Sequence, residues 1–146
     1  VVVRPGKPNK ATSSFASSII REPLQGKEAV CPVSKDTKLW IISPRKAIGN
    51  FIHAAELPGD AFSKHRTVSL PGLTVSVENM IKDLEAIAGQ ETVNRISWQP
   101  DNFIQKIVGS WPSAFAPKRA LALGFKADDS MAGIIQAFLE DELVNL

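Results

Sequence analysis

Val1-Val2-Val3-Arg4-Pro5-Gly6 is the stretch from which the fold of this chain is deduced. Three consecutive β-branched residues are typical of a buried strand in a parallel sheet, and Pro5-Gly6 is a turn signal that ends such a strand. The sheet neighbours of a strand at residues 1–4 have to come from elsewhere. We therefore expect the chain to be the C-terminal half of a longer protein whose N-terminal half is absent.

Composition limits the classes of partner. The 146 residues have the length of one domain, and a hydrophobic fraction of 44% predicts a packed core. The net charge is +2 and the basic residues form no dense stripe, so no nucleic-acid partner is predicted. No apolar run reaches the roughly 20 residues of a membrane span, so no membrane partner is predicted either. Cys31 is the only cysteine, which excludes a disulfide within the chain, and the cytoplasm is the expected location.

Residue types needed for some chemistries are missing. The chain contains no Tyr, and its nine Gly are scattered, so no Gly-rich phosphate-binding motif occurs. The chain therefore supplies neither a dinucleotide-binding turn nor a tyrosine acid–base group of its own. His53 and His65 stand 12 positions apart without a matching carboxylate pattern, so no metal site is predicted.

Turn and helix signals predict an α/β first half and a mostly helical second half. Ser43 and Pro44 predict a helix start, because Ser caps helices and Pro favours the first helical position. No linker-like stretch separates the two halves. Strands are predicted at 1–4, 29–33, 39–42, 66–70 and 94–98. Helices are predicted from 12 or 13 to 23, from 44 to the Pro58-Gly59 stop, and at 77–88, 101–108, 117–123 and 129–143.

This order of segments resembles the C-terminal half of the extended short-chain dehydrogenases/reductases, the NAD-dependent epimerase/dehydratase group. The landmarks that carry the resemblance are residues 1–6, 15–27, 39–55, 67–72 and 120–125. The resemblance implies an α/β, Rossmann-type protein in which residues 1–146 hold the last sheet strands and a mostly helical substrate domain. Strands 1–4 and 66–70 would complete the sheet of the cofactor domain. The catalytic Tyr and Lys, and most of the NAD site, would lie in the absent N-terminal half.

The likeness within that group is to an oxidoreductase of four-carbon sugar acids, and it rests on residues 3–9, 14–24 and 39–45. It implies that the complete protein is an NAD-dependent enzyme that oxidises a hydroxyl of a small sugar acid, and that this chain alone is inactive. Two alternatives stay open: an NAD-dependent nucleotide-sugar epimerase or dehydratase, and a non-catalytic α/β interaction domain. The sugar acid, the choice of NAD or NADP and the oligomeric state also stay open, although unpaired strand edges favour association.

The resemblance assigns candidate site residues at the start of the chain. It places Pro5 and Gly6 beside the nicotinamide of the cofactor, and the alternative is a plain strand-ending turn. It offers the side chains of Asn9, Thr12 and Ser13 to the substrate or the nicotinamide, and the alternative is helix capping.

Arg45 is the remaining candidate. Many members of the group carry Val-Asp-Asp where this chain has Ser43-Pro44-Arg45. A cation near a helix N-terminus is disfavoured by the helix dipole, and a guanidinium grips a carboxylate with two hydrogen bonds. Arg45 is therefore predicted to bind the carboxylate of the substrate, with a solvated side chain as the alternative. Arg21, on the first predicted helix, is expected to be solvated.

Overall fold

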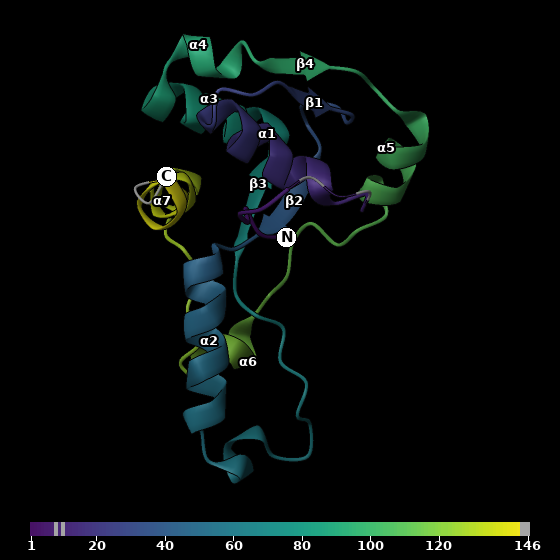
Figure 1. The fold of residues 1–146 in the computed structure, drawn as a ribbon. Helices are drawn as coiled ribbons and strands as arrows, with labels where there is room; N and C mark the ends of the chain where they lie inside the picture. Colours follow the sequence, from purple (N-terminus) through teal and green to yellow (C-terminus); the bar gives the residue numbers. More distant parts are fainter. Residues whose placement is uncertain (8, 10, 144–146) are drawn as a thin grey trace.

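The structure is a computed structural model that describes residues 1–7, 9 and 11–143. Figure 1 shows a larger part that contains the strands and most helices, and a smaller part below it that contains α2 and α6. The helices and helical turns are α1 (Ser14–Leu24), α2 (Pro44–Glu56), η1 (Gly59–Phe62), α3 (Val77–Ala88), α4 (Gln90–Val93), α5 (Asn102–Gly109), α6 (Lys118–Ala122), α7 (Met131–Phe138) and η2 (Leu139–Leu143). The strands are β1 (Ala29–Cys31), β2 (Lys38–Ile41), β3 (Leu73–Ser76) and β4 (Ile96–Trp98).

The described strands form two separate pairs. Strand β1 runs parallel to β4, with Ala29 opposite Ile96. Strand β2 runs antiparallel to β3, with Lys38 opposite Ser76. The predicted α/β class is confirmed, and so are the strands expected within 29–33, 39–42 and 94–98.

The strand predicted at residues 1–4 is reduced to one parallel bridge, in which Val2 lies opposite Ile42. The amide of Ile42 donates to the carbonyl of Val1 at 3.0 Å. Two residues after Val2, the amide of Arg4 donates to Oγ of Ser17 at 3.0 Å, so a side chain of α1 replaces a neighbouring strand. The segment therefore follows β2 for a single residue pair.

Residues 66–70, predicted as a strand, pair with no described strand, and the strand in this region is β3, which begins only after Gly72. Their place in the sheet of an N-terminal half stays a prediction. At Gly72 the chain approaches β2 so closely that an added Cβ would lie 2.7 Å from the carbonyl oxygen of Ile41. Before that point the backbone is held by side chains: Nε1 of Trp40 donates to the carbonyl of Leu70 at 3.3 Å. The apolar alternation of 66–70 thus reflects packing of its side chains, and no described strand pairs with it.

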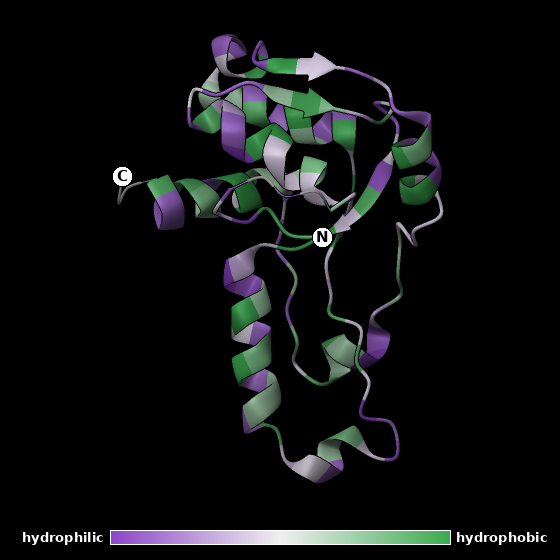
Figure 2. Cartoon of the chain, turned by 45° about the vertical axis from the view of Figure 1, so that its right-hand side comes forward, coloured by the Kyte–Doolittle hydropathy of each residue, from purple (hydrophilic) through white to green (hydrophobic). Residues whose placement is uncertain are grey.

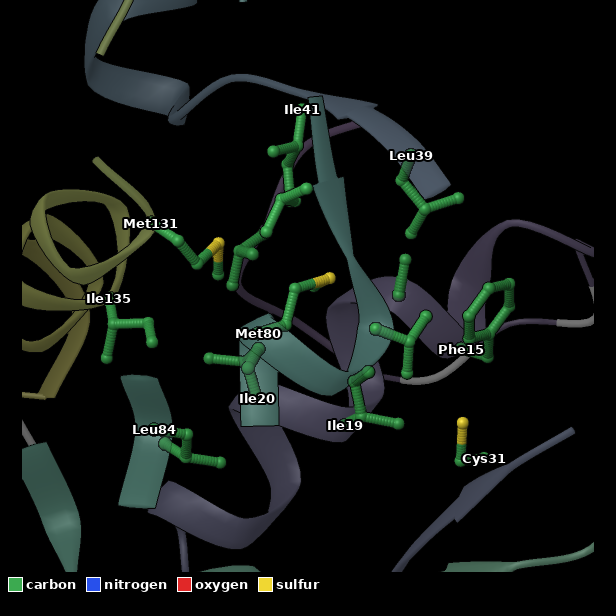
Figure 3. Packing of buried hydrophobic residues seen from close by; sticks show 14 of the residues in the cluster. Phe15, Ile19, Ile20, Cys31, Leu39, Ile41, Met80, Leu84, Met131 and Ile135 are labelled. Carbon is green, nitrogen blue, oxygen red and sulfur yellow. The ribbon is translucent and has the colours of Figure 1, made fainter. Parts of the chain in front are cut away.

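The helices of the larger part meet in one core. Figure 3 shows that the side chains of α1, α3 and α7 converge on those of β2. Their apolar residues recur three or four positions apart, which is the spacing expected of a helix face that packs on a core. The members labelled in Figure 3 are Phe15, Ile19, Ile20, Cys31, Leu39, Ile41, Met80, Leu84, Met131 and Ile135.

The start of α2 confirms the capping prediction. Oγ of Ser43 accepts a hydrogen bond from the amide of Lys46 at 3.1 Å, and Pro44 occupies the first helical position of α2. The hydroxyl of Ser43 and its amide also donate to the carboxylate of Asp128, both at 2.7 Å. The buried Asp128 therefore joins the start of α2 to the segment before α7.

Candidate substrate groove

A groove of about 530 Å³ lies between the start of α1, strand β1 and helix α5. Polar groups come from the loop before α1 and from one side of that helix, and apolar groups come from β1 and α5. The described residues that line the groove are Asn9, Ala11, Thr12, Ser14, Phe15, Ser18, Glu22, Glu28, Ala29, Val30, Pro32, Asp101, Phe103 and Ile104.

Asn9 shapes the loop that leads into α1. Its side-chain Oδ1 accepts a hydrogen bond from the backbone amide of Ala11 at 3.0 Å, and the backbone amide of Asn9 donates to Oγ of Ser14 at 3.4 Å. Ser13 stands at the N-cap of α1, but its side chain makes no capping hydrogen bond and it does not line the groove. The structure therefore brings Asn9 and Thr12 together in the groove and leaves Ser13 beside it.

A buried ion pair lies under the groove and corrects the expectation for Arg21. The side chain of Arg21 is completely buried, and its Nη2 donates to Oε1 of Glu22 at 2.6 Å. Its Nη1 donates to the carbonyl of Arg4 at 3.0 Å and to Oγ of Ser17 at 3.1 Å. The guanidinium therefore bridges residues 1–4 to α1, because acceptors from both segments surround it.

Three acidic residues are among the described residues that line the groove. Glu22, Glu28 and Asp101 line it, and no Lys or Arg occurs among the described lining residues. Asp101 already caps α5, since its Oδ1 accepts from the amides of Phe103 and Ile104 at 2.8 and 3.0 Å. Oε2 of Glu22 is buried and has no hydrogen-bond partner among the described residues. An unpaired buried acceptor favours a ligand that donates hydrogen bonds, such as a hydroxyl group.

Pro5 and Gly6 line a second, adjoining pocket of about 340 Å³. Glu22 lines both the pocket and the groove, so the two share a wall. Gly6 has a φ of +93°, a conformation that residues with a Cβ rarely adopt. The pocket also contains Lys7 and Lys27, whose charges are opposite to those of the acidic residues of the groove.

Arg45 lies outside the groove, in a separate cavity of about 310 Å³. Its Nη2 donates to Oδ1 of Asp141 at 2.6 Å and to Oε2 of Glu140 at 3.0 Å. These hydrogen bonds raise the pKa of Arg45 and lower the pKa values of Asp141 and Glu140. In this structure, then, the carboxylates that offset a cation at the start of α2 belong to the chain itself.

Sequence reasoning missed part of the groove. Ser18 and Glu22 stand one helical turn apart on α1, and Phe103 belongs to α5, where it is 71% exposed. The spacing of Ser18 and Glu22 was the available signal, because residues i and i+4 share a helix face. No signal within the sequence relates α5 to α1.

The described residues contain neither a candidate metal site nor a membrane-spanning helix. Among residues 1–7, 9 and 11–143 there is no group of three or more His, Cys, Asp or Glu side chains placed to hold a metal ion. Across the same residues, no helix combines the length and the apolar character needed to cross a membrane.

Comparison with known proteins identifies relatives along almost the whole chain. It is 47% identical over 143 residues to the D-erythronate dehydrogenase of Haemophilus influenzae, matching 98% of this chain and 45% of that protein. It is 48% identical over 141 residues to the D-erythronate dehydrogenase of Cupriavidus necator, matching 97% of this chain and 44% of that protein. No family model matches the sequence.

Solved structures agree with this result. A nucleoside-diphosphate-sugar epimerase from Agrobacterium tumefaciens superposes with a TM-score of 0.94 at 42% identity, over 99% of this chain and 42% of that chain. The L-threonine dehydrogenase from Phytophthora infestans superposes with a TM-score of 0.82 at 18% identity, over 99% of this chain and 46% of that chain. The second likeness concerns the fold alone.

Along nearly its whole length the chain is therefore similar to D-erythronate dehydrogenases and to a nucleoside-diphosphate-sugar epimerase. It spans less than half the length of the two D-erythronate dehydrogenases described above.

Proposed function

We propose that this chain is the C-terminal, substrate-recognising half of a nicotinamide-dependent dehydrogenase that oxidises a hydroxyl of a small sugar acid such as D-erythronate. The observation that carries the proposal is the 47–48% identity to two D-erythronate dehydrogenases over nearly the full chain. An N-terminal half would supply the dinucleotide-binding turn and the catalytic Tyr and Lys, none of which this chain provides. A reducing compartment such as the cytoplasm suits a protein with one buried, unpaired Cys31.

The charges of the groove suggest how a sugar acid is oriented. Carboxylates repel the acid group of the substrate, whereas hydroxyl groups donate to carboxylate oxygens. The hydroxyl-bearing end of the substrate would therefore lie near Asn9, Thr12 and Glu22, with its carboxylate directed out of the groove. Ser13, beside the groove, remains a proposed substrate ligand on the family resemblance alone. Arg45, in its separate cavity, remains a proposed ligand because this chain has Ser43-Pro44-Arg45 where many members of the group have Val-Asp-Asp.

The adjoining pocket is the proposed place for the nicotinamide end of the cofactor. A bound nicotinamide accepts the hydride that leaves the substrate carbon. Gly6 presents backbone without a side chain at the pocket that adjoins the groove, which suits close approach of a flat ring. Pro5 fixes the backbone before Gly6 and so helps to hold this conformation.

The test is a dehydrogenase assay on a joined protein, in which this chain follows the N-terminal part of the H. influenzae relative that precedes the matched region. We expect reduction of NAD or NADP with D-erythronate. Asn9→Ala and Thr12→Val are expected to raise KM for the sugar acid by about tenfold, the effect of losing one hydrogen bond to substrate.

The control is Asn79→Ala, because Asn79 is exposed on α3 and does not line the groove. This variant should leave the KM for the sugar acid and the KM for the cofactor unchanged. Equal losses in all three variants would remove the groove from the site. No reduction of either cofactor with any four-carbon sugar acid would refute the proposed activity.

A second candidate rests on the solved epimerase that shares 42% identity with this chain. An epimerase returns the hydride to the same substrate, so no reduced cofactor accumulates. Parallel incubations of the joined protein with D-erythronate and with nucleotide sugars separate the two activities. A dehydrogenase builds up NADH or NADPH from D-erythronate, and an epimerase interconverts nucleotide sugars without building up reduced cofactor. A joined protein with neither activity would favour the non-catalytic interaction domain.

A further inference from the structure

Helix α1 presents two polar side chains to the groove, one helical turn apart. Figure 2 shows hydrophilic and hydrophobic residues interspersed along the helices of the larger part of the molecule. On α1, Ile19 and Ile20 are buried in the core, whereas Ser18 and Glu22 line the groove. Because residues i and i+4 share a helix face, Ser18 and Glu22 stand on the same side of α1 and can meet the same ligand.

The guanidinium of Arg21 fixes the hydrogen-bonding role of Ser18. Nη2 of Arg21 donates to Oγ of Ser18 at 3.3 Å. A guanidinium carries N–H donors and no acceptor, so the Ser18 oxygen is the acceptor in this contact. The O–H of Ser18 is then left to donate in another direction. Since Ser18 lines the groove, it is set up to donate a hydrogen bond to a ligand there.

The same guanidinium fixes the role of Glu22. Nε and Nη2 of Arg21 both donate to Oε1 of Glu22, at 3.2 and 2.6 Å. The other oxygen, Oε2, is buried and has no hydrogen-bond partner among the described residues. The Glu22 side chain is only 8% exposed, and residues of this chain produce that burial. Rotation about the last bond of a Glu side chain is soft, so a small turn brings Oε2 to the groove that Glu22 lines.

The neighbouring polar groups do not share this arrangement. Asp101 is engaged at the start of α5, where its Oδ1 accepts from two backbone amides, and Glu28 is exposed. Ser17 is also bonded to Arg21, at 3.1 Å, but it accepts from the amide of Arg4 and donates to its carbonyl, and it does not line the groove. Ser18 and Glu22 are therefore the groove residues that Arg21 orients.

We propose that Ser18 and Glu22 together recognise one hydroxyl group of the substrate, and that Arg21 is the positioning residue for both. The hydroxyl oxygen accepts from the O–H of Ser18, and the hydroxyl proton is donated to Oε2 of Glu22. This inference rests on the proposed function for the identity of the substrate, and adds the pair of side chains that makes the site selective.

The chemistry of the pair excludes other groups from this position. A hydroxyl both donates and accepts, so it satisfies Ser18 and Glu22 at once. A carboxylate only accepts and is repelled by Glu22, and a methylene group satisfies neither residue. A site built to bond a hydroxyl rejects an analogue that lacks it, because the polar groups of the site are then left unpaired.

The test compares substrates of the joined protein defined above. The substrates are D-erythronate and the four-carbon acids that each lack one of its hydroxyls. The acid that lacks the oxidised hydroxyl cannot react, and one of the others should have a kcat/KM at least about 100-fold lower than D-erythronate. Ser18→Ala should lower kcat/KM for D-erythronate about tenfold and leave that of the poor substrate within about twofold. The preference for D-erythronate should therefore narrow about tenfold.

Two serine variants control for packing. Ser18→Thr keeps a hydroxyl at the same place and should restore most of the preference. Ser17→Ala removes a hydroxyl that is bonded to Arg21 outside the groove, and it should change kcat/KM for all substrates by the same factor. A structural role of Ser18 would likewise affect all substrates equally, so the ratio of their kcat/KM values separates recognition from packing.

Glu22→Gln tests the acceptor. Gln keeps one oxygen for Arg21 and replaces Oε2 by an amide group that donates. The preference for D-erythronate should fall roughly 10- to 150-fold, the effect of losing a hydrogen bond to a charged group. Urea unfolding of each variant shows that it is folded under the assay conditions.

The inference is overturned if Ser18→Ala lowers kcat/KM for D-erythronate and for the deoxygenated acids by the same factor, or leaves all of these values unchanged. It is also overturned if the unaltered joined protein uses every reactive deoxygenated acid as well as D-erythronate.

Calorimetric titration without cofactor separates the failure of this inference from that of the proposed function. A joined protein whose preferential binding of D-erythronate depends on Ser18, but which reduces no cofactor, leaves the hydroxyl recognition in place and refutes the activity. An active joined protein with the same preference in Ser18→Ala refutes the recognition and leaves the activity in place. Neither binding nor turnover of D-erythronate would refute both.

Discussion

The buried pair of Arg21 and Glu22 offers the sharpest stability experiment. Arg21 donates five hydrogen bonds, to Oε1 of Glu22 twice, to the carbonyl of Arg4, and to the hydroxyls of Ser17 and Ser18. Arg21→Met keeps an unbranched side chain of similar reach and removes all of these donors. The carboxylate of Glu22, whose side chain is 8% exposed, would then be buried without a partner.

Arg21→Met is expected to lower the free energy of unfolding strongly. Removal of one partner from a buried ion pair costs about 3–5 kcal/mol, because the remaining charge stays desolvated. For a chain of this length the midpoint of thermal unfolding should fall by roughly 6–20 °C, at about 2–4 °C for each kcal/mol. The hydrogen bonds to Arg4 and Ser17 also disappear, so contacts between residues 1–4 and α1 should loosen first.

The measurement is urea unfolding of the 146-residue chain, followed by circular dichroism. The double variant Arg21→Met, Glu22→Gln should recover part of the loss, with a coupling of about 0.5–3 kcal/mol, because the buried negative charge is gone. Arg45→Met is the control, because the Arg45 side chain is 49% exposed and its ion pairs lie at the surface. The midpoint of urea unfolding of this variant should hardly change. A loss below about 1 kcal/mol for Arg21→Met, a value typical of exposed pairs, would show that the guanidinium is not buried as described.

Further predictions concern the site and its charges. The 146-residue chain alone should reduce neither NAD nor NADP with D-erythronate, and turnover by the purified chain would contradict the need for an N-terminal half. In the joined protein, Arg45→Ala should raise KM for the sugar acid about tenfold or more and leave KM for the cofactor unchanged; an equal loss with a neutral polyol would remove Arg45 from the site. Arg45 lowers the pKa values of Glu140 and Asp141, so the stability that these carboxylates contribute is present at neutral pH. It is lost as the pH falls below their ordinary pKa values of 4.5 and 3.8. Urea unfolding at pH 3 to 6 should therefore show a weaker dependence of the free energy of unfolding on pH for Arg45→Met. Gly6→Ala should lower the stability of the chain, because a Cβ is strained at a φ of +93°, and an unchanged midpoint in urea would show that this turn relaxes.

Local chemistry was predictable from the sequence wherever a few neighbouring residues decide it. The start of α2 at Ser43-Pro44 and that of α3 at Ser76 follow from a hydroxyl that accepts from an amide three residues later. The groove residues Asn9 and Thr12 were found from a family landmark, and they lie together because the turn that precedes a helix is short. Ser18 and Asp101 were missed because their role depends on the packing of α1 beside β1 and α5.

The sequence by itself determined the α/β class and most helix boundaries, because caps, turns and apolar spacing act over a few residues. Only the tertiary structure decided that Arg21 is buried, that 66–70 pairs with no described strand, and that Ile48, Phe51 and Ile52 point away from the chain. It also decided that Arg45 binds Asp141, which lies 96 residues further along the chain. Burial and charge pairing depend on which distant segments meet in space, and the chemistry of neighbouring residues does not specify that meeting.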